Sequence, residues 1–219
     1  MGLLCFSHGS KERGSQMAIP VLSHAPAADL ESPEFLNEIS SRLMQEGASV
    51  TKIVKSSAIL VDERVRIKCQ IPICDTYGKN LMCPPLVVPS IEFFRKALSL
   101  YNEAILIQVK ADIPQHSAEG RKTEIYAPAG KLHHLVNQAE KWAFEYRYRF
   151  ALGLIGGCCR LCDSCVALTG KTICRHPFKA RPSMEAMGID VLATLERAGL
   201  KTATFPVAES VTWTGVLLV

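Results

Sequence analysis

Residues 158–165 read CCRLCDSC, and residues 174–177 complete the segment with CRHP. Counted from Cys159, the cysteines follow the pattern C-x2-C-x2-C-x8-C. Three cysteines so closely spaced must face a common centre. This is how a tight loop delivers three thiolates to a cubane iron–sulfur cluster, while a later cysteine supplies the fourth. Four-cysteine zinc sites more often use two separated C-x2-C pairs. The segment therefore predicts a metal site and favours a [4Fe–4S] cluster over zinc or unliganded thiols.

A second interpretation counts from Cys158, which turns the pattern into C-x3-C-x2-C. This is the spacing of radical enzymes that cleave S-adenosylmethionine, in which the cluster loop follows an early strand of a partial barrel. Only residues 166–219 follow the last of these cysteines, too few for such a barrel. Ser164 also stands where those enzymes usually carry an aromatic residue. We therefore reject this interpretation.

A second group of cysteines lies in residues 69–85, which read CQIPICDTYGKNLMCPP. Its spacing is C-x4-C-x8-C-P-P, and its proline, glycine and asparagine residues are typical of a structured loop. A Cys-Pro step also ends the cysteine run of bacterial ferredoxins, where proline turns the chain away from the cluster. The cysteine density predicts metal ligation here too. We call residues 69–85 the first cysteine loop and residues 158–177 the second cysteine loop.

The overall composition is that of a globular protein with an adequate core. The chain has 219 residues, of which 48% are hydrophobic and 21% are charged. The net charge is +4, and no basic stripe is interleaved with aromatic residues, so nucleic acid is not predicted as a partner. No apolar run approaches the length of a membrane span, so no membrane partner is predicted.

Nine cysteines in a short chain could form a disulfide framework. However, the chain begins MGLLCF, without the positive start and long apolar run of a secretory signal. Clustered cysteines in such a chain indicate metal binding in a reducing compartment. We therefore expect a cytoplasmic protein.

Periodicity and capping residues predict an α+β fold, in which helices cover a mixed β-sheet and both cysteine loops lie at one end. Residues 1–31 are expected to be a flexible extension, and residues 32–219 a single domain that contains both loops. The segment 111–127 is expected to be irregular. Helices are predicted over 33–46, 90–100, 129–148 and 183–198, and strands over 50–55, 59–61, 104–109, 151–155, 202–207 and 211–219.

Several motifs resemble the family known as domain of unknown function 2284. They lie in residues 61–66, 69–85, 159–177, 180–191 and 212–215. The resemblance implies metal binding, with iron–sulfur as the expected form, and no agreed reaction. It also implies seven motif cysteines, and Cys158 is an additional one. The seven correspond here to Cys69, Cys74, Cys83, Cys159, Cys162, Cys165 and Cys174.

Three arrangements of these thiolates remain open. Two clusters could form, one of them on Cys69, Cys74 and Cys83 with an open iron. Alternatively, Cys83 or Cys174 could cross over to the opposite loop, as the fourth ligand does in two-cluster ferredoxins. In the third arrangement one cluster forms and the spare cysteines are structural. Two clusters are favoured over one by the number of thiolates, and Cys158 could complete the second.

Residues beside the cysteines could assist a cofactor. Arg160, Arg175 and His176 are the predicted cofactor-binding residues, because nearby cations offset the negative charge of a thiolate-bound cluster. The same basic segment could dock an acidic redox partner. Candidate fourth ligands, or donors that would support the ligands, are Asp75, Tyr77, Lys79, Asn80 and His176.

Three hypotheses about function follow. The first is an electron-transfer protein that serves a reductase or an enzyme-activation step. The second is an enzyme that uses a three-cysteine cluster with an open iron for reductive or Lewis-acid chemistry on a small molecule. The third is a zinc-stabilised interaction module. No phosphate-binding glycine loop or hydrolytic triad motif is present in the sequence.

Overall fold

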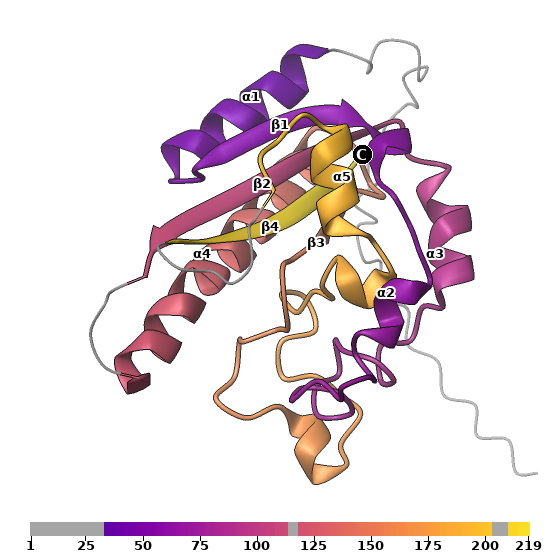
Figure 1. Ribbon diagram of the computed structural model, residues 1–219. Coiled ribbons are helices and arrows are strands. Elements are labelled where there is room, and N and C mark those ends of the chain that lie inside the picture. The colour runs from indigo at the N-terminus through magenta and orange to yellow at the C-terminus, as the bar shows by residue number, and fades with distance from the viewer. Residues whose placement is uncertain (1–32, 114–117, 203–209) are drawn as a thin grey trace, which may run out of the picture. The chain divides into compact units, whose positions relative to one another are not determined.

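The centre of the molecule is a four-stranded sheet with the order β1-β2-β4-β3 (Figure 1). The computed structural model describes residues 33–113, 118–202 and 210–219. The α+β class is confirmed. The three strand pairs in the described residues are all antiparallel, whereas the sequence predicts a mixed sheet. The strands are β1 (Val50–Lys55), β2 (Glu103–Asp112), β3 (Leu152–Leu154) and β4 (Ser210–Leu218).

Strand β2 is central and is buried on both faces. Its apolar run, residues 104–107, has no polar alternation, which is typical of a strand covered on both sides. Ile105 and Ile107 contribute to one core cluster, whereas Ala104 and Leu106 contribute to another. This period of two follows from the pleat of the strand. The sheet therefore separates two hydrophobic cores.

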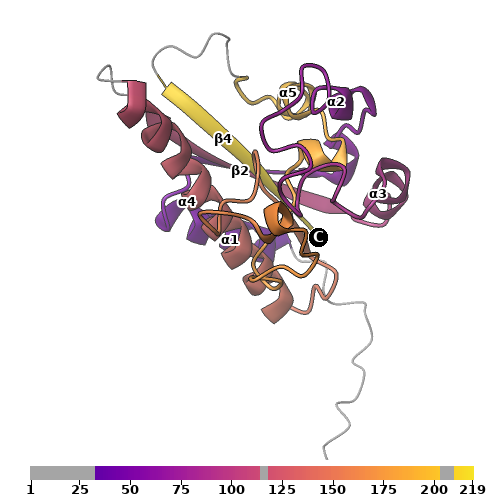
Figure 2. The same ribbon diagram turned by 90° about the horizontal axis from the view of Figure 1, so that it is seen from below.

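Helices cover both faces of the sheet (Figure 2). On one side lie α1 (Pro33–Gln45) and α4 (Ala118–Glu145), whose buried residues pack in the same core cluster as Ile105. On the other side lie α2 (Arg64–Ile67), α3 (Ile91–Leu98) and α5 (Val191–Arg197). In the described residues, no helix combines the length and the apolar composition that crossing a membrane requires.

Helix α4 begins earlier than predicted. The sequence predicts an irregular segment over 111–127, but β2 extends to Asp112 and the helix begins at Ala118. Pro128 explains the error, because a proline removes a backbone donor and usually lies near a helix start. The structure instead continues the helix through this proline.

The same helix ends earlier than predicted, at Glu145 rather than at residue 148. Arg147 adopts a left-handed conformation with φ 71°. The amide of Tyr148 then donates to the Ala143 carbonyl at 3.0 Å, a bond that closes the last helical turn. No glycine marks this end, so the sequence offers no stop signal there.

The helix predicted over 183–198 is broken in two. A short 3-10 turn, η4 (Glu185–Met187), is followed by Gly188 with φ 81°, and only then by α5. Gly188 lies against Ile91, whose side chain would be 3.0 Å from a Cβ at this position. Ser183 caps the first piece, and Asp190 caps α5 by accepting from the Ala193 amide at 3.0 Å.

The other predicted elements have mixed outcomes. A predicted strand over 59–61 is absent: η2 (Ser56–Ala58) is followed by a single bridge between Val61 and Ile189. Most of the predicted strand 202–207 and the predicted extension 1–31 lie outside the described residues. The predictions for α1, α3, β1, β2, β3 and β4 are confirmed to within a few residues.

Candidate metal centre

Both cysteine loops are anchored on residues 183–190, which we call the platform. Ile155, just after β3, bridges to Ser183, and Val61, just before α2, bridges to Ile189. The second cysteine loop therefore begins and ends near Ser183, at one end of the platform. The chain enters the first cysteine loop from Ile189, at the other end. In Figure 1 the two loops, purple and orange, lie together below α2 and β3.

Arg66 of α2 fastens the first cysteine loop to the platform. Its Nε and Nη2 donate to the Ala186 carbonyl at 2.9 and 2.7 Å, and Nη2 also donates to the Pro89 carbonyl at 3.0 Å. Ala186 belongs to the platform, and Pro89 follows the loop. The planar guanidinium group of Arg66, which precedes the loop, thus binds both the platform and the segment that follows the loop.

Asn80 joins the two loops directly. Its Nδ2 donates to the Cys159 carbonyl at 2.8 Å, and its Oδ1 accepts from the Met82 amide at 3.0 Å. The residue is only 8% exposed. The sequence predicts Asn80 as a possible ligand or supporting donor. In the structure both ends of its amide are engaged with the backbone, so it positions the loops.

Two glycines and Trp213 determine how the chain enters the second cysteine loop. A Cβ on Gly156 would lie 2.7 Å from the Thr214 carbonyl oxygen, and one on Gly157 would lie 2.6 Å from the Trp213 ring. Gly157 also has φ 68°, which other residues rarely adopt. The sharp turn that the Gly-Gly pair predicts is therefore present, and β4 lies against it.

The far end of the second loop is attached to α4. The Lys179 carbonyl is hydrogen-bonded to His133 Nε2 at 2.8 Å and accepts from Asn137 Nδ2 at 3.1 Å. Arg181 forms a half-buried ion pair with Glu140, with Nη2 2.5 Å from Oε1. Burial also lowers the pKa of His133, so this histidine is a structural residue of the helix.

The eight described cysteines are all free thiols. Within the part of the chain that the structure describes, no group of three or more His, Cys, Asp or Glu side chains is close enough to hold a metal ion directly. The sulfur atoms nevertheless divide into two neighbourhoods, one at each loop.

The first neighbourhood contains Cys69, Cys74, Cys83 and Cys158. Cys83 is 7% exposed. Burial raises its pKa to about 12, a hydrogen bond to Thr76 opposes the rise, and negative charge at the other three sulfurs adds to it. The Thr76 hydroxyl lies 3.8 Å from the Cys83 sulfur and 3.3 Å from the Cys74 sulfur.

Cys158 belongs to this neighbourhood although it is the first residue of the second cysteine loop. Burial raises the pKa of Cys158, the charge of Arg160 lowers it, and negative charge at Asp75 and Cys74 raises it. Asp75 and Cys74 both belong to the first cysteine loop.

The second neighbourhood is formed by Cys159 and the later cysteines. Burial raises the pKa of Cys159, and negative charge at Cys174, Cys162 and Cys158 also raises it. The His176 amide donates to the Cys174 sulfur at 3.3 Å. Arg175 Nη1 donates to the Ser164 carbonyl at 2.7 Å, so the segments that carry Cys165 and Cys174 are joined by a hydrogen bond.

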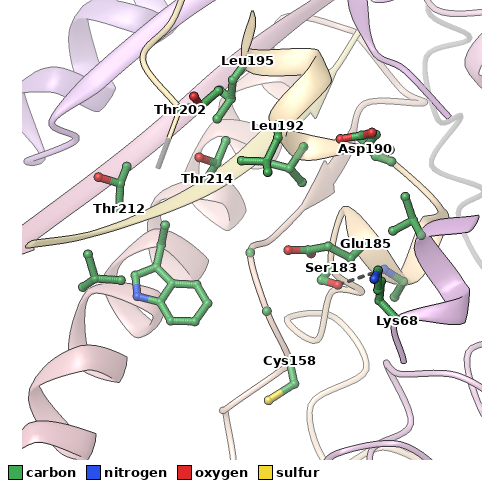
Figure 3. Close-up of a pocket in the computed structure, with 18 of the residues that line it drawn as sticks. Lys68, Cys158, Ser183, Glu185, Asp190, Leu192, Leu195, Thr202, Thr212 and Thr214 are labelled. Atoms are coloured by element: carbon green, nitrogen blue, oxygen red, sulfur yellow. Dashed lines mark hydrogen bonds between the residues drawn. The ribbon is translucent and has the colours of Figure 1, made fainter. Parts of the chain in front are cut away.

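A large cavity opens beside the first neighbourhood. Its volume is about 1430 Å³, and its lining includes Cys69, Cys74, Cys83 and Cys158. Of the eight described cysteines, the other four do not line it. Figure 3 shows Cys158 on the cavity wall together with Glu185 of the platform. The cavity therefore separates Cys69, Cys74, Cys83 and Cys158 from the other four described cysteines.

Glu185 is a cavity residue that the sequence analysis does not identify. Its Oε2 is shielded from solvent and has no hydrogen-bond partner among the described residues. Burial raises the pKa of this carboxyl, and hydrogen bonds from its own amide, the Ser183 hydroxyl and the Gly157 amide oppose the rise. In the sequence, the only sign that Glu185 is buried is its position between the apolar residues Met184 and Ala186.

The predicted cofactor-binding residues lie around the second loop. The Arg160 guanidinium is 3.7 Å from the centre of the Tyr126 ring, a cation–π contact. Arg175 and His176 make the hydrogen bonds described above, through a side chain and a backbone amide respectively. Direct contact of these three residues with a cofactor stays a prediction.

An antiparallel sheet that holds two adjoining loops of free thiols at one end defines a cysteine-rich metal-binding protein. Residues 52–219 match the family described as predicted metal-binding protein (DUF2284), and the chain belongs to this family. All seven motif cysteines lie within the matched range. No curated protein and no solved structure matches the chain. The family resemblance read from the motifs is confirmed.

Proposed function

We propose that the chain binds two [4Fe–4S] clusters and transfers electrons in the cytoplasm to a reductase or to an enzyme that it activates. The observation that carries this proposal is the gathering of eight free thiols in two hydrogen-bonded loops. Each [4Fe–4S] cluster is held by four cysteine thiolates, so this donor set is sufficient for two.

The surroundings of the thiols suit such clusters. Hydrogen bonds to cluster sulfurs and nearby charges adjust the reduction potential. The Thr76 hydroxyl and the His176 amide occupy such positions beside the sulfurs of Cys74 and Cys174. When bound, the clusters would accept and release single electrons. Asn80 would keep the two loops, and hence the two sites, next to each other.

The proposed partner is an acidic redox protein. The second cysteine loop and the residues after it carry the exposed cations Lys171, Arg175 and Lys179, and Asp163 is the only acid between Cys158 and Arg181. Opposite charges steer two redox proteins together and orient them. The partner would thus approach the second loop from solvent.

Anaerobic purification tests the proposal. We expect brown protein with about eight irons and about eight acid-labile sulfides per chain. A colourless protein that contains zinc would overturn it in favour of the zinc-stabilised module. Protein with about four irons per chain would overturn the two-cluster form.

The cavity favours a second candidate function. A space of about 1430 Å³ beside Cys69, Cys74 and Cys83 could admit a small molecule to an iron atom that lacks a protein ligand. The chain would then be an enzyme that performs reductive or Lewis-acid chemistry. The two candidates differ in whether a fourth thiolate completes the first site.

A further inference from the structure

We propose that Cys158 is the fourth metal ligand of the first cysteine loop, together with Cys69, Cys74 and Cys83, and that Cys159 belongs with Cys162, Cys165 and Cys174. This assignment rests on the proposed function, because it names the ligand sets of the two sites. It places two adjacent residues of the chain in two different sites.

The first argument is the direction of the two neighbouring side chains. Cys158 lines the cavity, and Cys159 does not. Cys159 instead packs against the core cluster that α1 and α4 cover. Cys158 therefore faces the first loop, whereas Cys159 faces α4.

The second argument is the backbone that holds this division. Gly157 is in contact with the Trp213 ring, so the chain reaches Cys158 in one orientation. The carbonyl of Cys159 is then fixed by Asn80, at 2.8 Å. Constraints on both sides of the 158–159 peptide make it difficult for the two side chains to exchange sides.

The third argument is the set of neighbours. Cys69, Cys74, Cys83 and Cys158 all line one cavity, and the Thr76 hydroxyl lies 3.3 Å from the Cys74 sulfur and 3.8 Å from the Cys83 sulfur. Cys159, Cys162, Cys165 and Cys174 do not line this cavity, and the Arg175 bond to the Ser164 carbonyl at 2.7 Å joins the segments that carry Cys165 and Cys174. The eight thiols thus divide into four and four, which removes the problem that seven motif cysteines leave one site a ligand short.

The assignment also bears on the choice of function. A first site with four thiolates has no iron left open, and such sites mainly carry electrons. The cavity would then expose one face of a fully ligated cluster. The assignment therefore favours electron transfer over chemistry at an open iron.

Variants in two backgrounds test the assignment on the full chain under anaerobic conditions. In the first background, Cys162→Ala and Cys174→Ala remove the second site, leaving about four irons per chain. We expect Cys158→Ala added there to change the electron paramagnetic resonance spectrum of the remaining reduced cluster and to lower its iron content at least twofold. Cys159→Ala should leave both unchanged.

In the second background, Cys69→Ala and Cys74→Ala remove the first site, and the effects of the two substitutions should be exchanged. Circular dichroism checks that each variant is folded, and a serine substitution at the same cysteine, which nearly preserves the side-chain volume, replaces any alanine variant that is not. The assignment is overturned if Cys159→Ala, rather than Cys158→Ala, perturbs the first-loop cluster, or if neither does. The proposed function fails separately, if the unsubstituted chain binds no iron.

Discussion

The sheet and the cysteine loops are stabilised in different ways. In the sheet, apolar side chains such as Ile105, Ile107 and Leu217 are fully buried. In the loops, Ile71 is 70% exposed, Leu168 is 58% exposed and Ile173 is 82% exposed. The sheet can thus fold on hydrophobic burial alone. The loops depend on a small number of polar contacts and, in our proposal, on the metal.

This contrast has a consequence for the folding of the metal-free protein. Metal binding to thiolates contributes directly to the stability of the segment that carries them. Removing the metal should therefore loosen the two loops and leave the sheet intact. Each of the following predictions tests whether a given residue belongs to the metal-independent or the metal-dependent region.

The largest effect is expected from a cavity in the sheet. Ile105→Ala removes a fully buried side chain of β2 and should lower the free energy of unfolding by about 2–5 kcal/mol. Urea denaturation followed by circular dichroism measures the change. The metal content of the protein that remains folded should equal that of the unsubstituted chain. Loss of metal without loss of stability would contradict the proposed independence of the two regions.

A smaller effect is expected where the second loop leaves the sheet. Gly157→Ala should cost about 2–3 kcal/mol, because it combines a positive φ with a contact to Trp213. Gly170→Ala is the matched control: Gly170 has φ 73° but open space around it, so only the backbone cost of about 1–2 kcal/mol applies. Metal content should fall only for Gly157→Ala. Equal losses of stability would show that the Trp213 contact does not constrain the loop.

A third effect should appear between the loops. Asn80→Ala removes the bond to the Cys159 carbonyl, but water can partly replace it, so we expect a loss of about 1 kcal/mol. The metal should dissociate faster, and a chelator assay measures the rate. Met82→Ala, beside Asn80 but without a side-chain bond to the second loop, is the control. An unchanged dissociation rate for Asn80→Ala would mean that the loops hold their metal independently.

Local sequence patterns were sufficient to predict most of the sheet and several helices. The apolar run of β2 and the apolar periodicity of α3 are local signals, and both describe the structure correctly. The α4 boundaries and the break at Gly188 were missed. Helix continuation through Pro128 and the fit of Gly188 against Ile91 both depend on residues that are distant or that act against local preference.

The candidate site shows the same limit. Spacing alone predicted the cysteine ligands, because groups of closely spaced cysteines are typical of metal sites. Spacing could not show that Cys158 and Cys159 face different loops. That division depends on Trp213, Asn80 and the Gly156–Gly157 turn, which meet only in the folded chain. Glu185 was missed because the predicted continuous helix gave no reason to place it at a cavity.

The smallest effect concerns Glu185 and is visible only as a dependence on pH. Burial raises the pKa of this carboxyl above its ordinary value of 4.5, so the folded state binds the proton more tightly than the unfolded state does. The stability contributed by this proton is fully present below pH 4.5 and is lost as the pH rises through the higher pKa of the folded state.

Glu185→Gln should therefore abolish that loss, since the amide has nearly the same shape and carries no charge. Unfolding free energies of the metal-free protein, measured from pH 4 to pH 8, should diverge between the variant and the unsubstituted chain as the pH increases. Glu196→Gln, on the exposed side of α5, removes the same charge from a solvated position and is the control. Parallel curves for Glu185→Gln and the unsubstituted chain would place the carboxyl in contact with water. The platform would then be a solvated part of the loop region, and the boundary between the metal-independent and metal-dependent regions would lie closer to the sheet.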